Sequence, residues 1–418
     1  MPTRHEQELR PTLRPVEARP IATEDGDMIA LKDPSGLAGD VVMLSPAAFV
    51  LATMMDGEHT LLDIQAEFCR RTGEILPSQA LMELIGQLDQ RHFLDSPTFQ
   101  EYVRELSQEF AASPVRPTAF AGRCYKSDPQ ALREELTGYF ISAEGPGALP
   151  GRGDGPVVAC MAPHIDLPRG GPVYAFTYSR LQAVPPDLVV VLGTSHQPTG
   201  ASLTFTRKNY DTPLGAIPTA TDVLDRLEPS FGDRLYAGEF AHRSEHSIEF
   251  QAVFLRHLWE HEPFQMLPIL CGALQETLSR GALPEDDTLF TDLVQALREV
   301  IMTRNALVIA SVDLSHVGPQ FGDPDRIDAP ARETLELQDR AVLEPLLVGD
   351  RKGFWERVWV DQDKNRLCGF VPIYTLLSVV GPVQGELLAY RQWPDPDATV
   401  SFASMVFTET SPSRRRPR

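Results

Sequence analysis

Short apolar runs that alternate with helical patterns constrain how residues 157–311 can fold. The runs VVACM (157–161), LVVVLG (188–193) and ALVIAS (306–311) are separated by patterns such as IEFQAVFLRHLW (248–259). This alternation is typical of α/β domains whose sheet is largely parallel. Two later segments, ELLAYRQW and VSFASMVFTE, supply closing strands. We predict an α/β fold with a mainly parallel central sheet flanked by helices.

The N-terminal third has a different pattern. A hairpin is expected around the turn Asp33-Pro34-Ser35-Gly36, followed by three short amphipathic helices between about residues 45 and 94. This order predicts a small winged-helix-like α+β domain. The predicted boundaries are a disordered N-terminus at 1–19, the small domain at 20–99, a linker at 100–118, the α/β domain at 119–410 and a basic disordered tail at 411–418.

Charge and cysteine usage narrow the class of protein. Aspartate and glutamate number 58 against 38 lysines and arginines, a net charge of −20, which argues against a nucleic-acid or membrane-surface binder. Five scattered cysteines without a CxxC pair suit a reducing compartment. The N-terminus lacks the apolar core of a signal peptide, and no segment is long enough for a membrane span. We therefore expect a cytoplasmic protein.

Histidines follow three of the predicted strands. His164 follows the first run, His196 the second, and Asp313 and His316 the third. Ligands of open α/β sheets bind beyond the carboxyl ends of the strands. The chain has 10 histidines, so three in equivalent places indicate one shared site rather than three unrelated structural residues.

Two further segments can contribute to this site. His246 lies between Glu245 and Glu249, and Glu249 can share a helix face with it. Cys368 directly precedes an apolar helix that begins near Phe370, and a thiol near a helix N-terminus tends toward the thiolate. Cys368 can also be read as a small buried residue, and Cys160 and Cys271 look like packing residues.

Two reaction classes can be written with these side chains. Two imidazoles and a thiolate make a three-ligand site for iron, copper or zinc, with a nearby histidine as acid or base. Alternatively, Cys368 acts as a nucleophile, His316 as its base, and Asp313 orients His316. Chemistry alone leaves both classes open. The chain contains no GxSxG, HExxH, P-loop or GxGxxG motif.

Residues 118–410 resemble the Memo family, the protein B component of the AmmeMemoRadiSam system. The resemblance rests on nine ordered motifs, among them APHIDLPRGGPVYAFTYSRL, VVVLGTSH, EHSIEFQAVFL, ASVDLSH and CGFVPIYTLL. It implies a fold like that of class III extradiol dioxygenases, which use non-haem Fe(II). Carried over by position, it implies metal ligands at His164, His196 and Cys368.

The same resemblance implies roles for other residues. His316 matches the acid/base of the dioxygenases, and His246 and Asp313 line the pocket as further catalytic candidates. We assign Asp166, Arg169, Ser195, Glu245 and Asp211 to the substrate pocket. The chain departs from the family at HIDLPRGG, at Gln197 and at GRCY, which puts the substrate rather than the metal site in doubt.

Residues 20–99 resemble the PqqD-like family of small peptide-binding chaperones, through LKDPSG, LSPAAFVLATMMDGEHTLLDI and LDQRHFLDSP. That resemblance implies a peptide or protein substrate and a radical SAM partner, and the resemblance to the AmmeMemoRadiSam system implies an AMMECR-type partner as well. We expect a metal-dependent oxidoreductase acting on a peptide or small aromatic substrate, with one metal ion, Fe(II) before copper or zinc. The alternative from another class is a non-catalytic metal-binding adaptor.

Overall fold

The computed structural model describes residues 8–23, 26–39, 41–149, 157–272, 274 and 281–410. The chain divides into two compact units, Met1–Ala112 and Ser113–Arg418. The predicted basic tail at 411–418 and the first seven residues lie outside the described ranges. Within those ranges, no helix is both long and apolar enough to cross a membrane.

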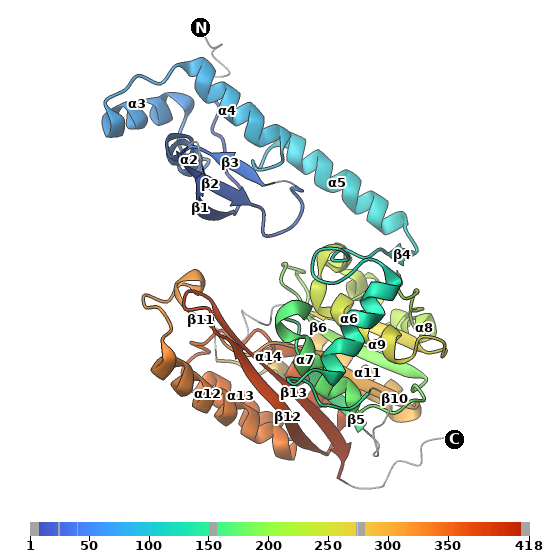
Figure 1. The fold of residues 1–418 in the computed structure, drawn as a ribbon. Helices are drawn as coiled ribbons and strands as arrows, with labels where there is room; N and C mark the ends of the chain where they lie inside the picture. The colour runs from blue at the N-terminus through green and yellow to red at the C-terminus, as the bar shows by residue number, and fades with distance from the viewer. Residues whose placement is uncertain are drawn as a thin grey trace. The chain divides into compact units, whose positions relative to one another are not determined.

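In the ranges that the structure describes, the N-terminal unit combines a small antiparallel sheet with four helices (Figure 1). Capping side chains fix where its helices begin, as at Thr60, which forms a capping box with Asp63, and Gly73 ends the same helix in the left-handed conformation. The elements are β1 (Glu17–Thr23), β2 (Gly26–Lys32), β3 (Val42–Leu44), α2 (Pro46–Thr53), α3 (Leu61–Thr72), α4 (Ser78–Gln90) and α5 (Pro97–Ala112).

Two segments differ from the sequence-based expectation. Of the residues that were predicted to be disordered, those from Glu17 to Arg19 are paired instead, because β1 pairs with β2 from Glu17 onward. Leu13 N also donates to Met55 O at 2.6 Å. Most of the predicted linker is helix α5, which Ser96 caps by accepting a hydrogen bond from Phe99 N at 3.2 Å. The prolines that suggested a linker begin only at Pro114, after the helix has ended.

The C-terminal unit is built on an eight-stranded sheet in the order β11-β13-β5-β10-β6-β9-β7, with β12 paired to β13. The four strands β5, β10, β6 and β9 run parallel, whereas β13, β7, β11 and β12 add antiparallel pairs at the margins. The prediction of a mixed α/β fold with a mostly parallel centre is confirmed. The strands are β4 (Val115–Arg116), β5 (Val157–Ala162), β6 (Leu188–Thr194), β7 (Leu203–Phe205), β8 (Asn209–Tyr210), β9 (Gln265–Cys271), β10 (Ala306–Ser311), β11 (His316–Val317), β12 (Val383–Trp393) and β13 (Thr399–Glu409).

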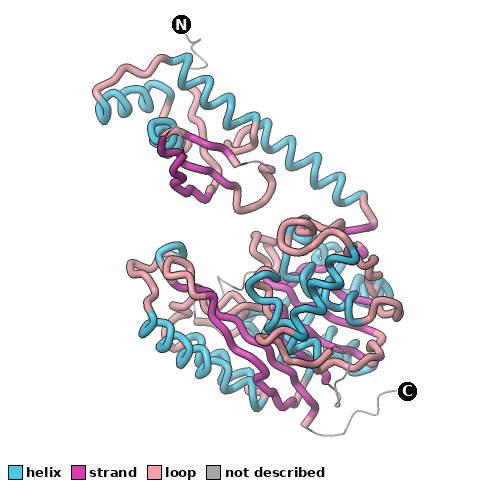
Figure 2. The backbone as a smooth tube through the Cα atoms, viewed as in Figure 1, coloured by secondary structure: helices cyan, strands magenta, loops and turns pink. Residues whose placement is uncertain are grey.

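Helices cover both faces of this sheet (Figure 2). Side chains alternate along β6, so that Val190 packs into one core and Val191 into the other. Helices α6, α7 and α9 contribute to one core, and α8, α11, α13 and α14 to the other. The helices are α6 (Pro129–Ile141), α7 (Leu167–Ser179), α8 (Thr221–Phe231), α9 (His246–Leu258), α11 (Thr288–Thr303), α12 (Ala329–Leu343), α13 (Arg351–Trp359) and α14 (Phe370–Val380), with 3-10 turns at Gly232–Tyr236, Glu239–Ser244, Pro284–Asp286, Pro319–Phe321 and Glu344–Val348.

The register of the parallel strands brings their carboxyl ends together. Ser311 at the end of β10 is paired with Ala162 of β5 on one side and with Gly193 of β6 on the other. The segments that follow these three strands therefore leave the sheet at the same edge. They carry His164, His196 and Asp313.

Candidate metal centre

His164 lies two residues beyond β5, with an almost fully buried ring. Its Nδ1 is 3.0 Å from the carbonyl oxygen of Ser311. A carbonyl oxygen can only accept a hydrogen bond, so Nδ1 carries the proton and Nε2 keeps a free lone pair. Burial lowers the pKa of His164 well below its usual range, which keeps the ring neutral.

His196 is oriented by a buried carboxylate. Glu245 Oε1 lies 3.0 Å from His196 Nδ1, and Glu245 Oε2 accepts a hydrogen bond from the backbone N–H of His196 at 2.8 Å. Burial by itself raises the pKa of Glu245, but His196 and His246 beside it lower that pKa further than burial raises it. The ionised carboxylate binds the Nδ1 proton. Burial lowers the pKa of His196, but the charge of Glu245 raises it further, so Nε2 must give up a proton before it can bind a metal ion.

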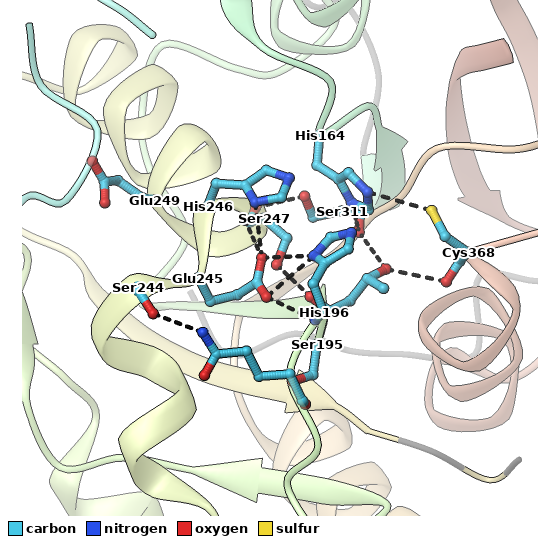
Figure 3. A network of polar contacts seen from close by, with 12 residues as sticks. His164, Ser195, His196, Ser244, Glu245, His246, Ser247, Glu249, Ser311 and Cys368 are labelled. Carbon is cyan, nitrogen blue, oxygen red and sulfur yellow. Dashed lines mark hydrogen bonds and ion pairs between the residues drawn. The ribbon is translucent and has the colours of Figure 1, made fainter. Parts of the chain in front are cut away.

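His246 begins helix α9, and its Nδ1 lies 3.2 Å from the same Glu245 Oε1. The ligating atoms of His164, His196 and His246 all lie within 4.8 Å of one another, so the three rings could hold a metal ion. Figure 3 shows the rings grouped together, with Glu245 beneath His196 and His246. From the sequence, His246 was predicted to be a catalytic residue. The structure places it among the side chains that could bind a metal ion.

Cys368 stands at the other side of His164 (Figure 3). Its Sγ is 3.3 Å from His164 Nε2 and 3.5 Å from the carbonyl oxygen of Asp313. Burial raises the pKa of the Cys368 thiol well above its usual range, contrary to the thiolate expected from its place before α14. A thiolate at this position therefore needs a neighbouring cation, such as a metal ion.

Asp313 and His316 both flank this cluster. Asp313 Oδ1 accepts a hydrogen bond from the backbone N–H of His164 at 3.0 Å, and burial raises the pKa of Asp313 to about 7. His316 Nδ1 donates to the carbonyl of Leu314 at 3.1 Å. Burial, and then the nearby His196, lower the pKa of His316 to about 4, so its ring is neutral near pH 7.

The residues predicted to form a substrate pocket have surroundings that differ from one residue to the next. Asp166 and Arg169 form a two-pronged ion pair with separations of 2.7 and 2.9 Å, and the Arg169 guanidinium lies over the Trp393 ring. Ser195 donates to the carbonyl of Gln197. Asp211 lies beside Arg116, to whose carbonyl its N–H donates at 3.0 Å. Their part in substrate binding stays a prediction.

Several supporting residues were not identified from the sequence. Gln251 is fully buried and donates to the carbonyl of Pro163 and to Ser311 Oγ, both at 2.7 Å, so it fixes the segments that carry His164 and its acceptor. Arg116 is fully buried, pairs with Glu249 and donates to the carbonyl of Glu245 at 2.8 Å. Glu249 was expected to share a helix face with His246, but its side chain points away from the histidines (Figure 3) and pairs with Arg116.

The fold and the site together define a class of protein: mixed α/β proteins that carry a histidine-rich candidate metal centre at the carboxyl ends of their parallel strands. Within this class, the profile of the Memo-like protein family matches residues 116–406. The chain belongs to the Memo-like family.

Three similar proteins illustrate the match. A MEMO1 family protein of Aquifex aeolicus is 27% identical over 405 residues, covering 96% of this chain and 100% of the relative, and so includes the N-terminal unit. A MEMO1 family protein of Methanopyrus kandleri is 31% identical over 306 residues, 70% of this chain and 98% of the relative. A crystal structure of an uncharacterized Escherichia coli K12 protein shares 12% identity over 53% of this chain and 86% of that chain, with a TM-score of 0.30, which carries no argument about the fold.

Proposed function

We propose that the C-terminal unit binds a single metal ion and acts as a metal-dependent oxidoreductase on a peptide or small aromatic substrate. The observation that carries the proposal is the orientation of the histidines. Ser311 and Glu245 accept hydrogen bonds from Nδ1 of His164 and His196, so Nε2 is the nitrogen that each ring has left to bind a metal ion. Metal-ligating histidines are held in this way by acceptors around the site.

The donor set fits a first-row transition metal. Imidazole nitrogens suit iron, copper and zinc, and a thiolate shifts the preference among them. His164 and His196 would be ligands in either arrangement, with Cys368 or His246 completing the set. We propose Cys368 as the third ligand and Fe(II) as the ion. Bound there, Fe(II) would supply one-electron and oxygen chemistry.

The surrounding residues would then handle protons and orientation. His316 has a neutral ring near pH 7, which can take a proton from a substrate hydroxyl or amide. Glu245 and the carbonyl of Ser311 would hold the two ligating rings in place. Asp313, bonded to the backbone of His164, would fix the segment that carries the first ligand.

Metal analysis of the anaerobically purified full chain tests the proposal. We expect close to one equivalent of iron after anaerobic loading, and its loss in His164→Ala and His196→Ala. His261→Ala, at an exposed histidine, is the matched control and should keep its metal. A parent chain that takes up no metal under these conditions would remove the basis of the proposal.

Cobalt substitution identifies the third ligand. If Cys368 binds the ion, the Co(II)-loaded chain shows a thiolate-to-cobalt charge-transfer band that Cys368→Ser abolishes while His246→Ala keeps it. If the band is missing in the parent and His246→Ala loses the metal, three histidines form the site instead.

The N-terminal unit supports a peptide or protein substrate only through its resemblance to PqqD-like chaperones. We propose that residues 20–99 bind a peptide and bring it to chemistry shared with a radical SAM protein and an AMMECR-type protein. The proposal is checked by purifying the full chain together with its radical SAM partner. Peptides taken from the substrate of that partner are then titrated into the full chain. Absence of saturable peptide binding would contradict it without affecting the metal site.

The two alternatives predict different behaviour. A metal-binding adaptor keeps both metal and partner binding in His316→Ala, and the parent chain shows no turnover. An enzyme loses product formation in that variant and keeps its metal. The cysteine-hydrolase alternative is disfavoured, because burial holds the pKa of the Cys368 thiol far above the range of an activated nucleophile.

A further inference from the structure

A cleft of about 500 Å³ opens beside the candidate metal centre. His196 and Cys368 both line it, together with Ser195. Small-ligand sites usually enclose about 300–1,000 Å³, so the cleft has the size of a binding site. A molecule in this cleft would reach the same cluster that the proposed metal ion would occupy.

The walls of the cleft are mainly apolar. The apolar part of the lining includes Pro198, Trp359, Leu367, Phe370 and Val371, and its uncharged polar part includes Gln197 and Gln362. Trp359 ends helix α13, and Phe370 and Val371 begin helix α14. The lining therefore comes from the segments that follow β6 and β9, from the facing ends of α13 and α14, and from the connection between these two helices.

The charged groups in the described lining are already engaged. Arg366 donates from Nε to the carbonyl of His316 at 2.9 Å and forms an ion pair with Asp323. Asp363 Oδ1 accepts a hydrogen bond from Leu367 N at 2.8 Å, and burial raises the pKa of Asp363 to about 6. Away from His196 and Cys368 at the candidate metal centre, a charged group brought into the cleft would leave water without an uncommitted partner, which is costly.

A second, independent observation concerns the backbone of the same lining. Gln362, Asp363 and Arg366 have φ angles of 59°, 52° and 55°, in the left-handed region that side chains other than glycine disfavour. Among described residues, the other non-glycine case is His92, in the N-terminal unit. Strained backbone of this kind concentrates at ligand clamps and active sites. All three residues line the cleft.

We infer that this cleft binds an uncharged, apolar group of the substrate, of the size of a leucine or phenylalanine side chain. The reacting end of the same molecule would lie against His196 and Cys368. The inference rests on the proposed function, since it adds a substrate class to that site. Its physical basis is the gain from burying the apolar group against the partly exposed Trp359 and Val371, compared with the cost of burying an unpaired charge.

Four amino-acid amides that differ only in the side chain test the inference. The N-acetyl, N-methylamides of leucine, phenylalanine, glutamate and lysine are titrated into the full zinc-loaded chain and into the metal-free chain, with ligand-observed NMR. We expect the leucine and phenylalanine amides to bind about tenfold or more tighter than the charged pair. Equal affinities, or a preference for a charged amide, would overturn the inference.

Filling the cleft provides the structural control. Val371→Trp should weaken binding of the phenylalanine amide about tenfold or more, because the indole occupies space in the cleft. Val348→Trp, at a residue that is 73% exposed and away from the cleft lining, should not change it. Pro198→Trp blocks the cleft from the segment that follows β6 and decides the matter if Val371→Trp fails to fold.

Unchanged binding in a folded blocking variant would overturn the inference. Metal content measured on the same samples separates this inference from the proposed function. A chain that holds its metal but shows no side-chain preference contradicts the cleft assignment alone. A chain without metal contradicts the proposed function, and the amide titration of that chain still decides the cleft.

Discussion

At the scale of single residues, Glu245 is the group on which the candidate metal centre depends most. One buried carboxylate contacts Nδ1 of His196 and Nδ1 of His246 and accepts the backbone N–H of His196. It therefore sets the tautomer and the direction of two rings at once. Acceptors of this kind raise the basicity of the ligands they hold.

Replacing Glu245 by glutamine should weaken metal binding while the three rings remain present. The amide is a weaker acceptor and brings its own donors toward Nδ1, so we expect zinc affinity to fall about 10–100-fold. Competition with a chromophoric chelator measures the change. Glu333→Gln, at an exposed glutamate, should match the parent. Equal affinities for the two variants would show that Glu245 has no orienting role.

Part of this site could be predicted from the sequence. His164, His196 and Cys368 could be grouped because strand ends and family motifs point to them. The acceptor for His164 could not, because it is the backbone carbonyl of Ser311, and a carbonyl has no sequence signature. Gln251 and Arg116 were missed because buried polar residues look like surface residues in a sequence.

At the scale of elements, the close approach of α9 to β6 places His246 and Glu245. Gly193 in β6 allows this approach, since a Cβ there would lie 2.5 Å from Ile248 Cγ1 and 2.6 Å from Ser247 Oγ. Ser247 Oγ in turn donates to the carbonyl of Thr194 at 2.8 Å. The helix is therefore held against the strand at the turn that carries the site.

Gly193→Ala should separate these two elements. Overpacking of this kind costs about 1–3 kcal/mol of unfolding free energy, and the shift of α9 should also lower metal affinity. Gly138→Ala in α6 is the control, since nothing lies within 4 Å of its added Cβ, and it should stabilise the chain by about 0.5–1 kcal/mol. Denaturant unfolding measures both. A Gly193→Ala chain as stable as the parent would contradict the packing argument.

The sequence predicted most elements of the sheet but not all of the N-terminal unit. Apolar runs identify β5, β6 and β10 because both faces of these strands are buried. Strand β1 was missed because all of its side chains are exposed, so it carries no apolar pattern. Most of helix α5 was predicted to be linker, because the helix buries only Phe110 and so has no clear apolar pattern.

At the scale of the whole molecule, buried histidines make stability depend on pH. His242 is fully buried, with Nε2 donating to the carbonyl of Thr204 and Nδ1 accepting from Tyr210, and burial lowers its pKa to about 3. Between about pH 6.5 and pH 3 the unfolded chain binds a proton at this residue that the folded chain does not. The unfolding free energy therefore falls as the pH is lowered through this range.

His242→Gln should reduce that dependence. The variant is expected to be less stable at pH 7, because the hydrogen bonds of the ring are lost, yet its melting temperature should fall less between pH 7 and pH 5. Thermal melts across this range, with His261→Gln as the control, measure the difference. Parallel pH profiles for parent and variant would contradict the assignment to His242.

The first residues of the C-terminal unit also determine where this unit can be truncated. Arg116 pairs with Glu249 inside the core, although the predicted domain begins only at residue 119. A chain that starts at Ser113 should fold, whereas one that starts at residue 119 leaves a buried carboxylate unpaired, at a cost of about 3–5 kcal/mol. Circular dichroism melts of the two chains measure this, and equal melting temperatures would contradict it.

Arg116 has a consequence for the order of events during synthesis. Its partners His242, Glu245 and Glu249 lie 126, 129 and 133 residues further along the chain. The contacts of Arg116 therefore cannot form until the ribosome has added those residues, and Cys368 is added later still. The N-terminal unit, complete at Ala112, can fold first. A nascent chain can thus complete its N-terminal unit before it contains all the residues of the candidate metal centre.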